Sequence, residues 1–82
     1  MLVRQPIEIA KIRVPVKRAK TLDPEKVTEI AVSILDEGML TPIHIRADKD
    51  GYVLLEGLHR LEACRELGEE TVDAYLMQAR LH

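Results

Sequence analysis

The sequence predicts a single α+β domain in which two main helices pack on a small mixed sheet. Two stretches carry apolar residues at helical spacing, and each stretch is closed by a glycine. Short runs of Val, Ile, Leu and Tyr flank and separate these stretches, which is typical of buried strands. A chain of 82 residues supports one modest core and no second domain. We therefore expect one domain over residues 1–82, with its core at about residues 9–76.

The first predicted element is an extended segment over residues 7–14. Its apolar positions are Ile7, Ile9, Ile12 and Val14, and their alternation changes phase between Ile9 and Ile12. Side chains of a strand alternate with a period of two, so a change of phase marks a break in the strand. We therefore expect two extended pieces with an irregularity between them.

The first helix is predicted to begin at Asp23-Pro24 and to end at Gly38. Asp is a favoured N-cap residue, Pro is favoured at the first helical position, and Gly commonly follows the last turn. Helical spacing also predicts the face that this helix buries. The residues of this face are Val27, Ile30, Ala31, Ile34 and Leu35.

A β-hairpin is predicted after the first helix, with strands at residues 43–46 and 52–55. The turn is assigned to Asp48-Lys49-Asp50-Gly51, because an Asp-Gly pair tolerates the positive φ angles of a tight hairpin turn. Asp48 and Asp50 are accordingly interpreted as turn residues and not as metal ligands. The three histidines also lack the spacing of a metal site, so we expect none.

A second helix is predicted from residue 58 to Gly68, followed by a last strand at residues 71–75. Leu61, Cys64 and Leu67 lie three residues apart and mark the buried face of this helix. Cysteine is among the most buried residue types, so Cys64 is interpreted as a small hydrophobic residue of the core.

The junction between the hairpin and the second helix, Glu56-Gly57-Leu58-His59-Arg60, is the most informative segment. The first N–H groups of a helix have no internal partner and carry partial positive charge, which favours an anion there. Gly57 permits a sharp turn and a close ligand approach, and Arg60 offers a planar fork for phosphate oxygens. His59 can donate to a phosphate or move a proton. A structural His and a solvated Arg would also produce this short pattern.

Several blocks of the sequence, taken in order, resemble the ParB/sulfiredoxin superfamily. They include a Ser-Ile pair, a helix-ending Gly and a Pro-Ile pair, as in ParB proteins. The Gly-Leu-His-Arg of this chain is similar to the Gly-Glu-Arg-Arg of ParB proteins and the Gly-Cys-His-Arg of sulfiredoxins. The similar blocks are residues 12–15, 23–27, 31–46, 51–63, 67–68 and 71–75. The resemblance implies a compact ParB/sulfiredoxin-like fold.

The same resemblance implies a nucleotide ligand, CTP or ATP or ADP, with or without Mg²⁺. Its phosphates would lie at the start of the second helix, and the corner after the first helix would wall the base or ribose. The implied phosphate-binding residues are Gly57, Leu58, His59 and Arg60, and the implied wall consists of Thr41 and Pro42.

Departures from the family pattern narrow the function. Leu58 stands where a sulfiredoxin carries its nucleophilic cysteine, so sulfiredoxin reductase activity is not expected. Cys64 does not replace that cysteine, because it lies about one and a half turns further along the helix. ParB partition proteins continue into a helix-turn-helix and a dimerisation region, whereas this sequence stops six residues after Leu76. Specific centromere binding is therefore not expected.

Two classes of function stay open. The domain could be a binding module, either a nucleotide switch or a small DNA-associated accessory protein. It could instead be a phosphotransferase or nucleotide hydrolase, since Glu56-Gly57-Leu58-His59 resembles a motif of the free serine kinases. Glu56 or His59 would then handle the proton. Glu56 could equally be an acidic residue that the helix dipole favours, and residues 15–20 lack the second carboxylate that those kinases use.

Charge is distributed unevenly along the chain. Residues 1–20 hold six basic residues and one acidic residue, a net charge of +5. Because the whole chain has a net charge of −2, residues 21–82 have a net charge of −7. The resemblance implies that this basic segment borders the nucleotide pocket, so Arg13, Lys17 and Arg18 are candidates for contacts with phosphates or a nucleic-acid backbone, although each could simply be solvated. The chain has two Tyr and no Phe or Trp, so stacking on bases is limited and nucleic-acid binding would be weak and salt-sensitive.

The composition also bears on location and assembly. No apolar run approaches the roughly 18 residues that a membrane span requires, and no basic leader precedes an apolar stretch. One cysteine cannot form an intramolecular disulfide, which fits a reducing compartment. We expect a cytoplasmic protein without a membrane partner. An early edge strand could also pair two copies into a homodimer.

Overall fold

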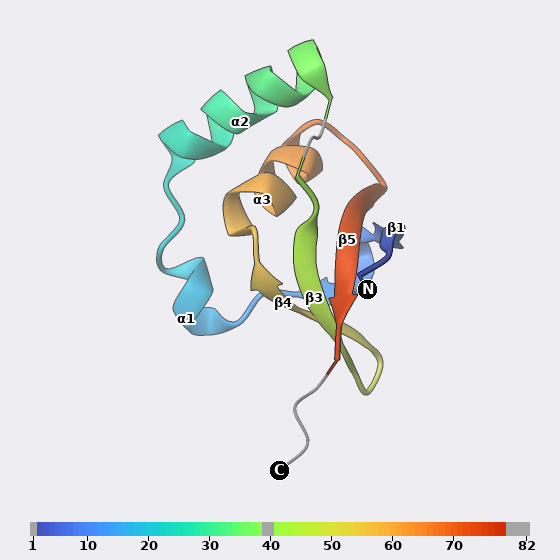
Figure 1. The fold of residues 1–82 in the computed structure, drawn as a ribbon. Helices are drawn as coiled ribbons and strands as arrows, with labels where there is room; N and C mark the ends of the chain where they lie inside the picture. Colours follow the sequence, from blue (N-terminus) through green and yellow to red (C-terminus); the bar gives the residue numbers. More distant parts are fainter. Residues whose placement is uncertain (1, 39–40, 79–82) are drawn as a thin grey trace.

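The computed structural model describes residues 2–38 and 41–78, which form one layer of sheet and one of helices (Figure 1). Helix α3 lies against the sheet, and helix α2 lies across α3. The elements in chain order are β1 (Arg4–Glu8), the 3-10 helix η1 (Ile9–Lys11), β2 (Ile12–Arg13), α1 (Val16–Ala19), α2 (Pro24–Glu37), β3 (Ile43–Asp48), β4 (Gly51–Glu56), α3 (Leu58–Glu66) and β5 (Thr71–Met77).

The strands form a mixed sheet in the order β1-β5-β3-β4-β2. Strands β1 and β5 pair antiparallel, as do β3 and β4 of the hairpin, whereas β3 pairs parallel with β5 and β2 pairs parallel with β4. The predicted α+β class with a small mixed sheet is therefore confirmed. The register of β3 on β4 shifts between His44 and Ile45.

The predicted irregularity in the first extended segment is confirmed. Helix η1 separates β1 from β2, and the N–H of Ile9 leaves the strand pattern to donate to the Glu70 carbonyl at 2.9 Å. Because β1 and β2 lie at opposite edges of the sheet, η1 is the point where the chain crosses from one edge to the other. Ile7, Ile9 and Ile12 stay buried on both sides of this crossing.

Helix α2 has the predicted ends. The Asp23 carboxylate accepts a hydrogen bond from the Glu25 N–H at 3.1 Å, Pro24 is the first helical residue, and Gly38 follows with φ 78°. The predicted apolar face needs one correction, because Leu35 is 72% exposed. With 100° per residue, Leu35 lies about 80° around the helix from the buried Val27, whereas Ile34 lies within about 20°. Helix α2 therefore contacts α3 along a narrow stripe of residues, and Leu35 lies beside that stripe.

The predicted hairpin is confirmed, but the explanation of its turn is wrong. Lys49 and Asp50 connect the strands, and the positive φ angles among the described residues belong to Gly38, Gly57 and Gly68. Gly51 is needed for a different reason. A Cβ at Gly51 would clash with the carbonyl oxygen of Lys11, so the glycine lets β4 approach the chain that leads into β2.

The main core lies between the sheet and α3, which ends at Glu66 with Leu67 as its C-cap. The predicted burial of Cys64 in this core is confirmed, and Leu67 is half-buried. A second, smaller cluster joins α2 to α3. The buried residues of the main core are Ile7, Ile9, Ile12, Ile43, Ile45, Leu54, Leu58, Leu61, Cys64, Val72 and Ala74, and those of the smaller cluster are Val27, Ala31 and Ala63.

Helix α1 was not predicted. It buries no residue, so its formation leaves no apolar spacing in the sequence. Pro15 precedes the helix as its N-cap, and its carbonyl accepts hydrogen bonds from the N–H groups of Arg18 and Ala19 at 3.0 Å. Among residues 2–38 and 41–78, no helix is long and apolar enough to cross a membrane.

Candidate functional site

The strand-to-helix junction predicted as an anion site is formed by the end of β4, Gly57 and the first turn of α3. Gly57 has a left-handed backbone, with φ 102° and ψ 32°, and places no capping side chain over the helix. The N–H of Leu61 donates to the Gly57 carbonyl at 2.9 Å and begins the backbone ladder of α3. The N–H groups of residues 58–60 precede that ladder, as at any helix start. They are therefore available to an anion.

Gly57 is fixed by the protein's own packing. Its φ favours glycine, and a Cβ there would lie 2.7 Å from Cγ2 of Ile43 on the neighbouring strand β3. Close ligand approach, the role suggested by the sequence, is not needed to explain this glycine. Ile43 is fully buried, so the junction is held against the rigid centre of the sheet.

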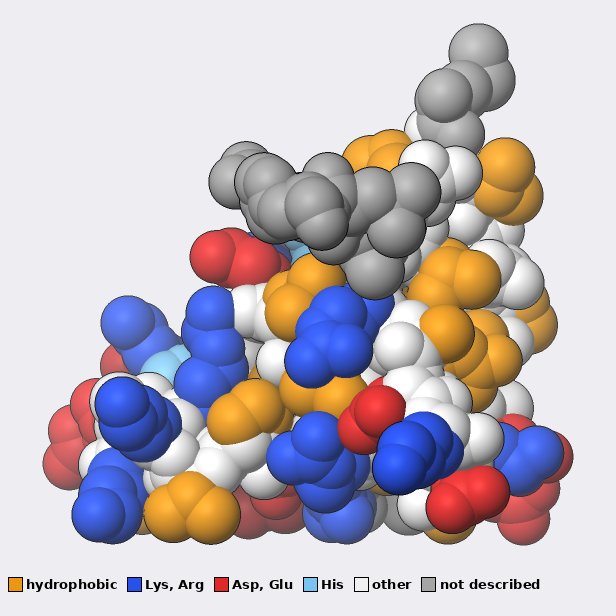
Figure 2. Space-filling model, turned by 90° about the horizontal axis from the view of Figure 1, so that it is seen from below, with side chains coloured by type: hydrophobic (Ala, Val, Ile, Leu, Met, Phe, Trp, Pro, Cys, Tyr) orange, Lys and Arg blue, Asp and Glu red, His pale blue; other side chains and the backbone are white. Residues whose placement is uncertain are grey.

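A hollow of about 300 Å³ lies beside this junction, and we call it the α3 hollow. It brings together Arg18 of α1, Lys26 of α2 and Arg60 of α3, with Glu56 as the acidic residue of its described lining. Figure 2 shows Lys and Arg side chains spread over the lower face of the molecule, the end near which α1 lies in Figure 1. The described lining consists of Arg18, Thr21, Lys26, Ile30, Glu56, Gly57, Leu58, His59 and Arg60.

His59 contacts another part of the chain directly. Its Nε2 accepts a hydrogen bond from the backbone N–H of Asp23 at 3.0 Å, and its side chain is half-buried. An imidazole that accepts at Nε2 in its neutral form carries its proton on Nδ1, which remains a donor. His59 therefore joins the start of α3 to the start of α2. In this arrangement Nε2 does not face a ligand as a proton acceptor.

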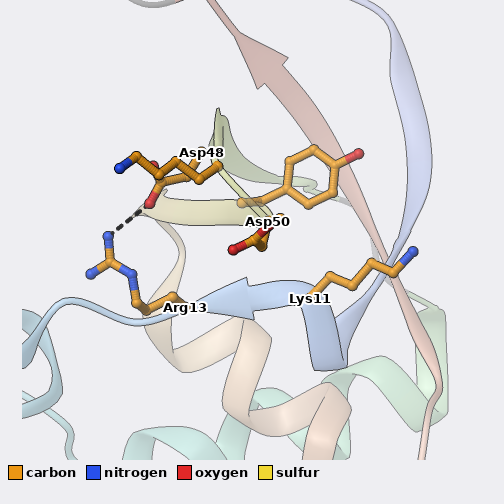
Figure 3. Close-up of a pocket in the computed structure, with 7 residues that line it drawn as sticks. Lys11, Arg13, Asp48 and Asp50 are labelled. Atoms are coloured by element: carbon orange, nitrogen blue, oxygen red, sulfur yellow. Dashed lines mark hydrogen bonds and ion pairs between the residues drawn. The ribbon is translucent and has the colours of Figure 1, made fainter.

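Arg13 was predicted together with Lys17 and Arg18, but the structure separates the three residues. Arg13 lines a second hollow of about 370 Å³, the hairpin hollow, where its Nη2 lies 3.1 Å from Oδ2 of Asp48 (Figure 3). Lys17 is exposed on α1 and is not part of the described lining of either hollow. Arg18 alone reaches the α3 hollow. The described lining of the hairpin hollow consists of Lys11, Arg13, Asp48, Lys49, Asp50, Gly51 and Tyr52.

One acidic residue of the hairpin turn, Asp48, is engaged in a contact within the protein. The hydrogen bond from Arg13 lowers the pKa of the Asp48 carboxyl, and the backbone N–H of Lys49 lowers it further. Among the described residues, no group of three or more His, Cys, Asp and Glu side chains is arranged to hold a metal ion. Asp48 thus serves as an ion-pair partner of β2.

Thr41 and Pro42 do not line the α3 hollow in the described part of the chain. Thr41 is exposed and Pro42 is buried, and the two residues before them, 39 and 40, lie outside the described ranges. Their predicted role as a wall for the base or ribose stays a prediction.

Lys26 and Thr21 line the α3 hollow but were missed in the sequence. Lys26 carried a usable signal, since it stands in the first turn of α2, where the helix dipole favours acidic residues. A basic residue there departs from that preference, although a solvated lysine would account for it equally well. Thr21 is folded back onto α1, where its Oγ1 donates to the Arg18 carbonyl at 2.8 Å.

Cys64 is unsuited to thiolate chemistry. It is 3% exposed beside the fully buried Leu61, and burial raises the pKa of its thiol, with smaller contributions from Glu69 and Asp73. A thiol with a raised pKa remains protonated near neutral pH and reacts slowly. The residue that stands in the sulfiredoxin cysteine position, Leu58, is itself part of the core.

Comparison with known proteins shows the family to which the chain belongs. The model of the ParB N-terminal domain matches residues 2–81 of the chain. The chain belongs to the ParB N-terminal domain family.

Two curated relatives are similar to most of this chain. Sulfiredoxin from Arabidopsis thaliana (chloroplastic/mitochondrial) is 38% identical over 72 residues, which are 88% of this chain and 56% of the relative. Stage 0 sporulation protein J from Bacillus subtilis is 33% identical over 73 residues, which are 88% of this chain and 26% of the relative. The chain thus spans about half of the first relative and a quarter of the second.

Solved structures confirm the predicted ParB/sulfiredoxin-like fold. A. thaliana sulfiredoxin superimposes with a TM-score of 0.83 at 30% identity, covering 94% of this chain and 86% of that one. The Caulobacter crescentus ParB complex with CTP-γ-S gives 0.80 at 23% identity, covering 95% and 46%. A free serine kinase variant in complex with AMP gives 0.80 at 18% identity, covering 94% and 32%. The last two likenesses establish the fold alone.

Proposed function

We propose that this domain binds the phosphates of a nucleotide at the N-terminus of α3 and acts as a ParB-like binding module. One observation carries the proposal. Three cations from three separate elements, Arg18, Lys26 and Arg60, line one hollow with the first turn of α3. The start of α3 and the three cations would attract the same ligand, an anion with several charged oxygens.

The number of cations favours a di- or triphosphate. Each phosphate oxygen that meets a guanidinium or ammonium group gains a charge-assisted hydrogen bond, and Arg60 can offer two in parallel. Leu58 is buried, so it would contribute its backbone N–H alone, beside the backbone N–H groups of Gly57 and His59. CTP, ATP and ADP are the candidates, with Mg²⁺ accompanying the phosphates where present. Thr41 and Pro42 would face the base or ribose.

A calorimetric titration tests this proposal. The protein is titrated with CTP, ATP and ADP, each with and without Mg²⁺, and Arg60→Ala and Arg65→Ala are compared with it. Arg65 is a matched control, because it lies on the same helix but pairs with Glu62 outside the α3 hollow. We expect saturable binding that Arg60→Ala weakens and Arg65→Ala retains. No heat of binding at millimolar nucleotide, or equal loss in both variants, would overturn the proposal.

An enzymatic function is the second candidate. Glu56 is exposed, ends β4 and lines the α3 hollow, so its carboxylate could accept the proton of a hydroxyl or water attacking the terminal phosphate. Glu56→Gln should then leave nucleotide affinity within about twofold while abolishing phosphate release or transfer. Retained turnover in this variant would exclude the role of Glu56. His59 is the other proton carrier, and His59→Gln tests it in the same assay.

For partners, we propose a cytoplasmic module with weak contacts to nucleic acid or protein. The cations of α1, Lys17 and Arg18, support an electrostatic contact, which should weaken steeply with salt. A homodimer through β1 is a weaker candidate. β1 is an edge strand, but Pro6 lacks the N–H that pairing would need. Gel-shift assays at two salt concentrations and analytical ultracentrifugation test these two proposals.

A further inference from the structure

The segment that carries Arg18 is held differently from the rest of the α3 hollow. Residues 16–22 are all exposed, and α1 buries no side chain. The backbone hydrogen bonds of this segment fold it onto itself, as in the bond from Thr21 N–H to the Arg18 carbonyl at 2.9 Å. The segment therefore lacks the apolar burial that fixes most of a fold, and it relies on its two ends.

The C-terminal end of this segment is attached to α3 through His59. The N–H of Asp23 donates to Nε2 of His59 at 3.0 Å, while the Asp23 carboxylate caps α2. The N-terminal end continues from β2, whose partner strand is β4. The hydrogen bond to His59 thus links the exposed segment to the helix whose first turn forms the anion site.

We propose that His59 is a positioning residue, which holds residues 15–23 over the first turn of α3 and thereby keeps Arg18 at the phosphate site. This inference rests on the proposed nucleotide site. It assigns the His59 ring to the placement of a second cation, whereas the family resemblance implied a phosphate ligand or proton carrier. The partner of Nε2 is a backbone N–H, so the role requires an acceptor and no proton transfer.

Electrostatic repulsion between the cations of the α3 hollow gives such a tether a role, even with Glu56 in the same lining. Arg18, Lys26 and Arg60 repel one another in the same hollow until an anion arrives. Arg60 is held by α3, and Lys26 by α2, which has its own packing on α3 through Val27 and Ala63. Arg18 has no such support and would move away into solvent. The loss of the tether should therefore affect Arg18 far more than Lys26.

Two variants of His59 distinguish the role of its hydrogen-bond acceptor from the role of its ring. In His59→Gln, the amide oxygen reaches the place of Nε2 and can accept from Asp23 N–H, whereas His59→Phe keeps a ring without an acceptor. Hydrogen exchange at the Asp23 amide, followed by NMR without nucleotide, reads the tether directly. We expect near-native protection in His59→Gln and a loss of about three- to tenfold in His59→Phe, the scale of one hydrogen bond. Equal protection in His59→Phe and the wild type would overturn the tether.

The affinity for inorganic triphosphate measures how the loss of the tether affects phosphate binding, because this ligand has no nucleobase. We expect His59→Phe to weaken binding about three- to tenfold in the wild-type and Lys26→Ala backgrounds. In an Arg18→Ala background the same substitution should change affinity less than about twofold, because the residue it positions is absent. Equal effects in all three backgrounds would refute the coupling to Arg18.

Two further outcomes also test the proposal. If His59→Gln loses as much affinity as His59→Phe while Asp23 stays protected, His59 contacts the phosphate directly and the proposal falls. If the wild-type protein binds neither triphosphate nor nucleotide, the proposed function fails, and the exchange at Asp23 alone then judges the tether. Thermal melting of each variant shows whether it is folded, and His59→Gln supplies a second, more conservative reading if His59→Phe is not.

Discussion

The α3 hollow and the hairpin hollow have similar volumes, about 300 and 370 Å³, and each is lined by three cations. They differ in what faces those cations. In the hairpin hollow, Arg13 pairs with Asp48 at 3.1 Å, and Lys11 lies 3.5 Å from the Glu8 carboxylate. In the α3 hollow, Glu56 is the acidic residue of the described lining, and the first turn of a nine-residue helix adds partial positive charge.

This difference separates a structural use of basic residues from a ligand-binding one. A carboxylate beside a cation repels an approaching anion and offsets the attraction of that cation, although an exposed ion pair itself contributes only about 0–1 kcal/mol. Within the described part of the chain, no ion pair engages Arg18, Lys26 or Arg60, so the mutual repulsion of these cations falls when an anion arrives. The two hollows have the same number of cations, so the pairing of those cations with carboxylates makes the α3 hollow the better candidate for an anion site.

The largest effect is expected at the glycine of the α3 hollow. Gly57→Ala combines a left-handed backbone, which costs about 1–2 kcal/mol, with a contact of 2.7 Å to Ile43, for which overpacking costs about 1–3 kcal/mol. Gly68→Ala is the matched control, since Gly68 has φ 76° and no atom within 4 Å of the added Cβ. Urea unfolding should show a loss of about 2–5 kcal/mol for Gly57→Ala and about 1–2 for the control. Equal losses would mean that β3 yields and the junction is not rigid.

The second effect compares one arginine from each hollow. Arg60→Ala should weaken nucleotide binding about 10- to 100-fold, because a charge-assisted contact at a helix start is lost. Arg13→Ala should change the affinity less than about twofold, because Arg13 serves Asp48. Calorimetry on the two variants measures both. A loss in Arg13→Ala as large as that in Arg60→Ala would place the phosphates at the hairpin and reverse the comparison.

The sequence predicted those parts of the fold that depend on neighbouring residues. Asp23 and Pro24 begin α2, and Gly38 ends it, because capping is decided within one turn. The strand-to-helix junction at Gly57 was found for the same reason. The change of phase after Ile9 likewise indicated the crossing at η1.

What the sequence could not show depends on residues that meet only after folding. Arg13 and Asp48 are 35 positions apart, so their ion pair leaves no local pattern. Arg13 was grouped with Arg18 because both lie in the basic segment that borders the nucleotide pocket in the family that the chain resembles. Gly51 was assigned to a positive φ, although it is required by the carbonyl of Lys11 on a distant segment. The bond from Asp23 to His59 spans 36 positions and was likewise not expected.

The smallest effect tests the ion pair that distinguishes the hairpin hollow. The pKa of Asp48 lies below its ordinary value of 3.8, chiefly because the carboxylate accepts a hydrogen bond from Arg13. A carboxyl whose pKa is lowered by folding stabilises the fold above its unfolded-state pKa. That contribution is lost as the pH falls through the lower, folded value.

NMR titration of the Asp48 carboxyl carbon should therefore give a midpoint below 3.8, and Arg13→Ala should move it upward. Lys11→Ala is the control, because Lys11 lines the same hollow but pairs with Glu8. A midpoint that Arg13→Ala leaves unchanged would show that Arg13 does not engage Asp48 in solution. Arg13 would then be as available to an anion as Arg60, and the contrast between the two hollows would no longer hold.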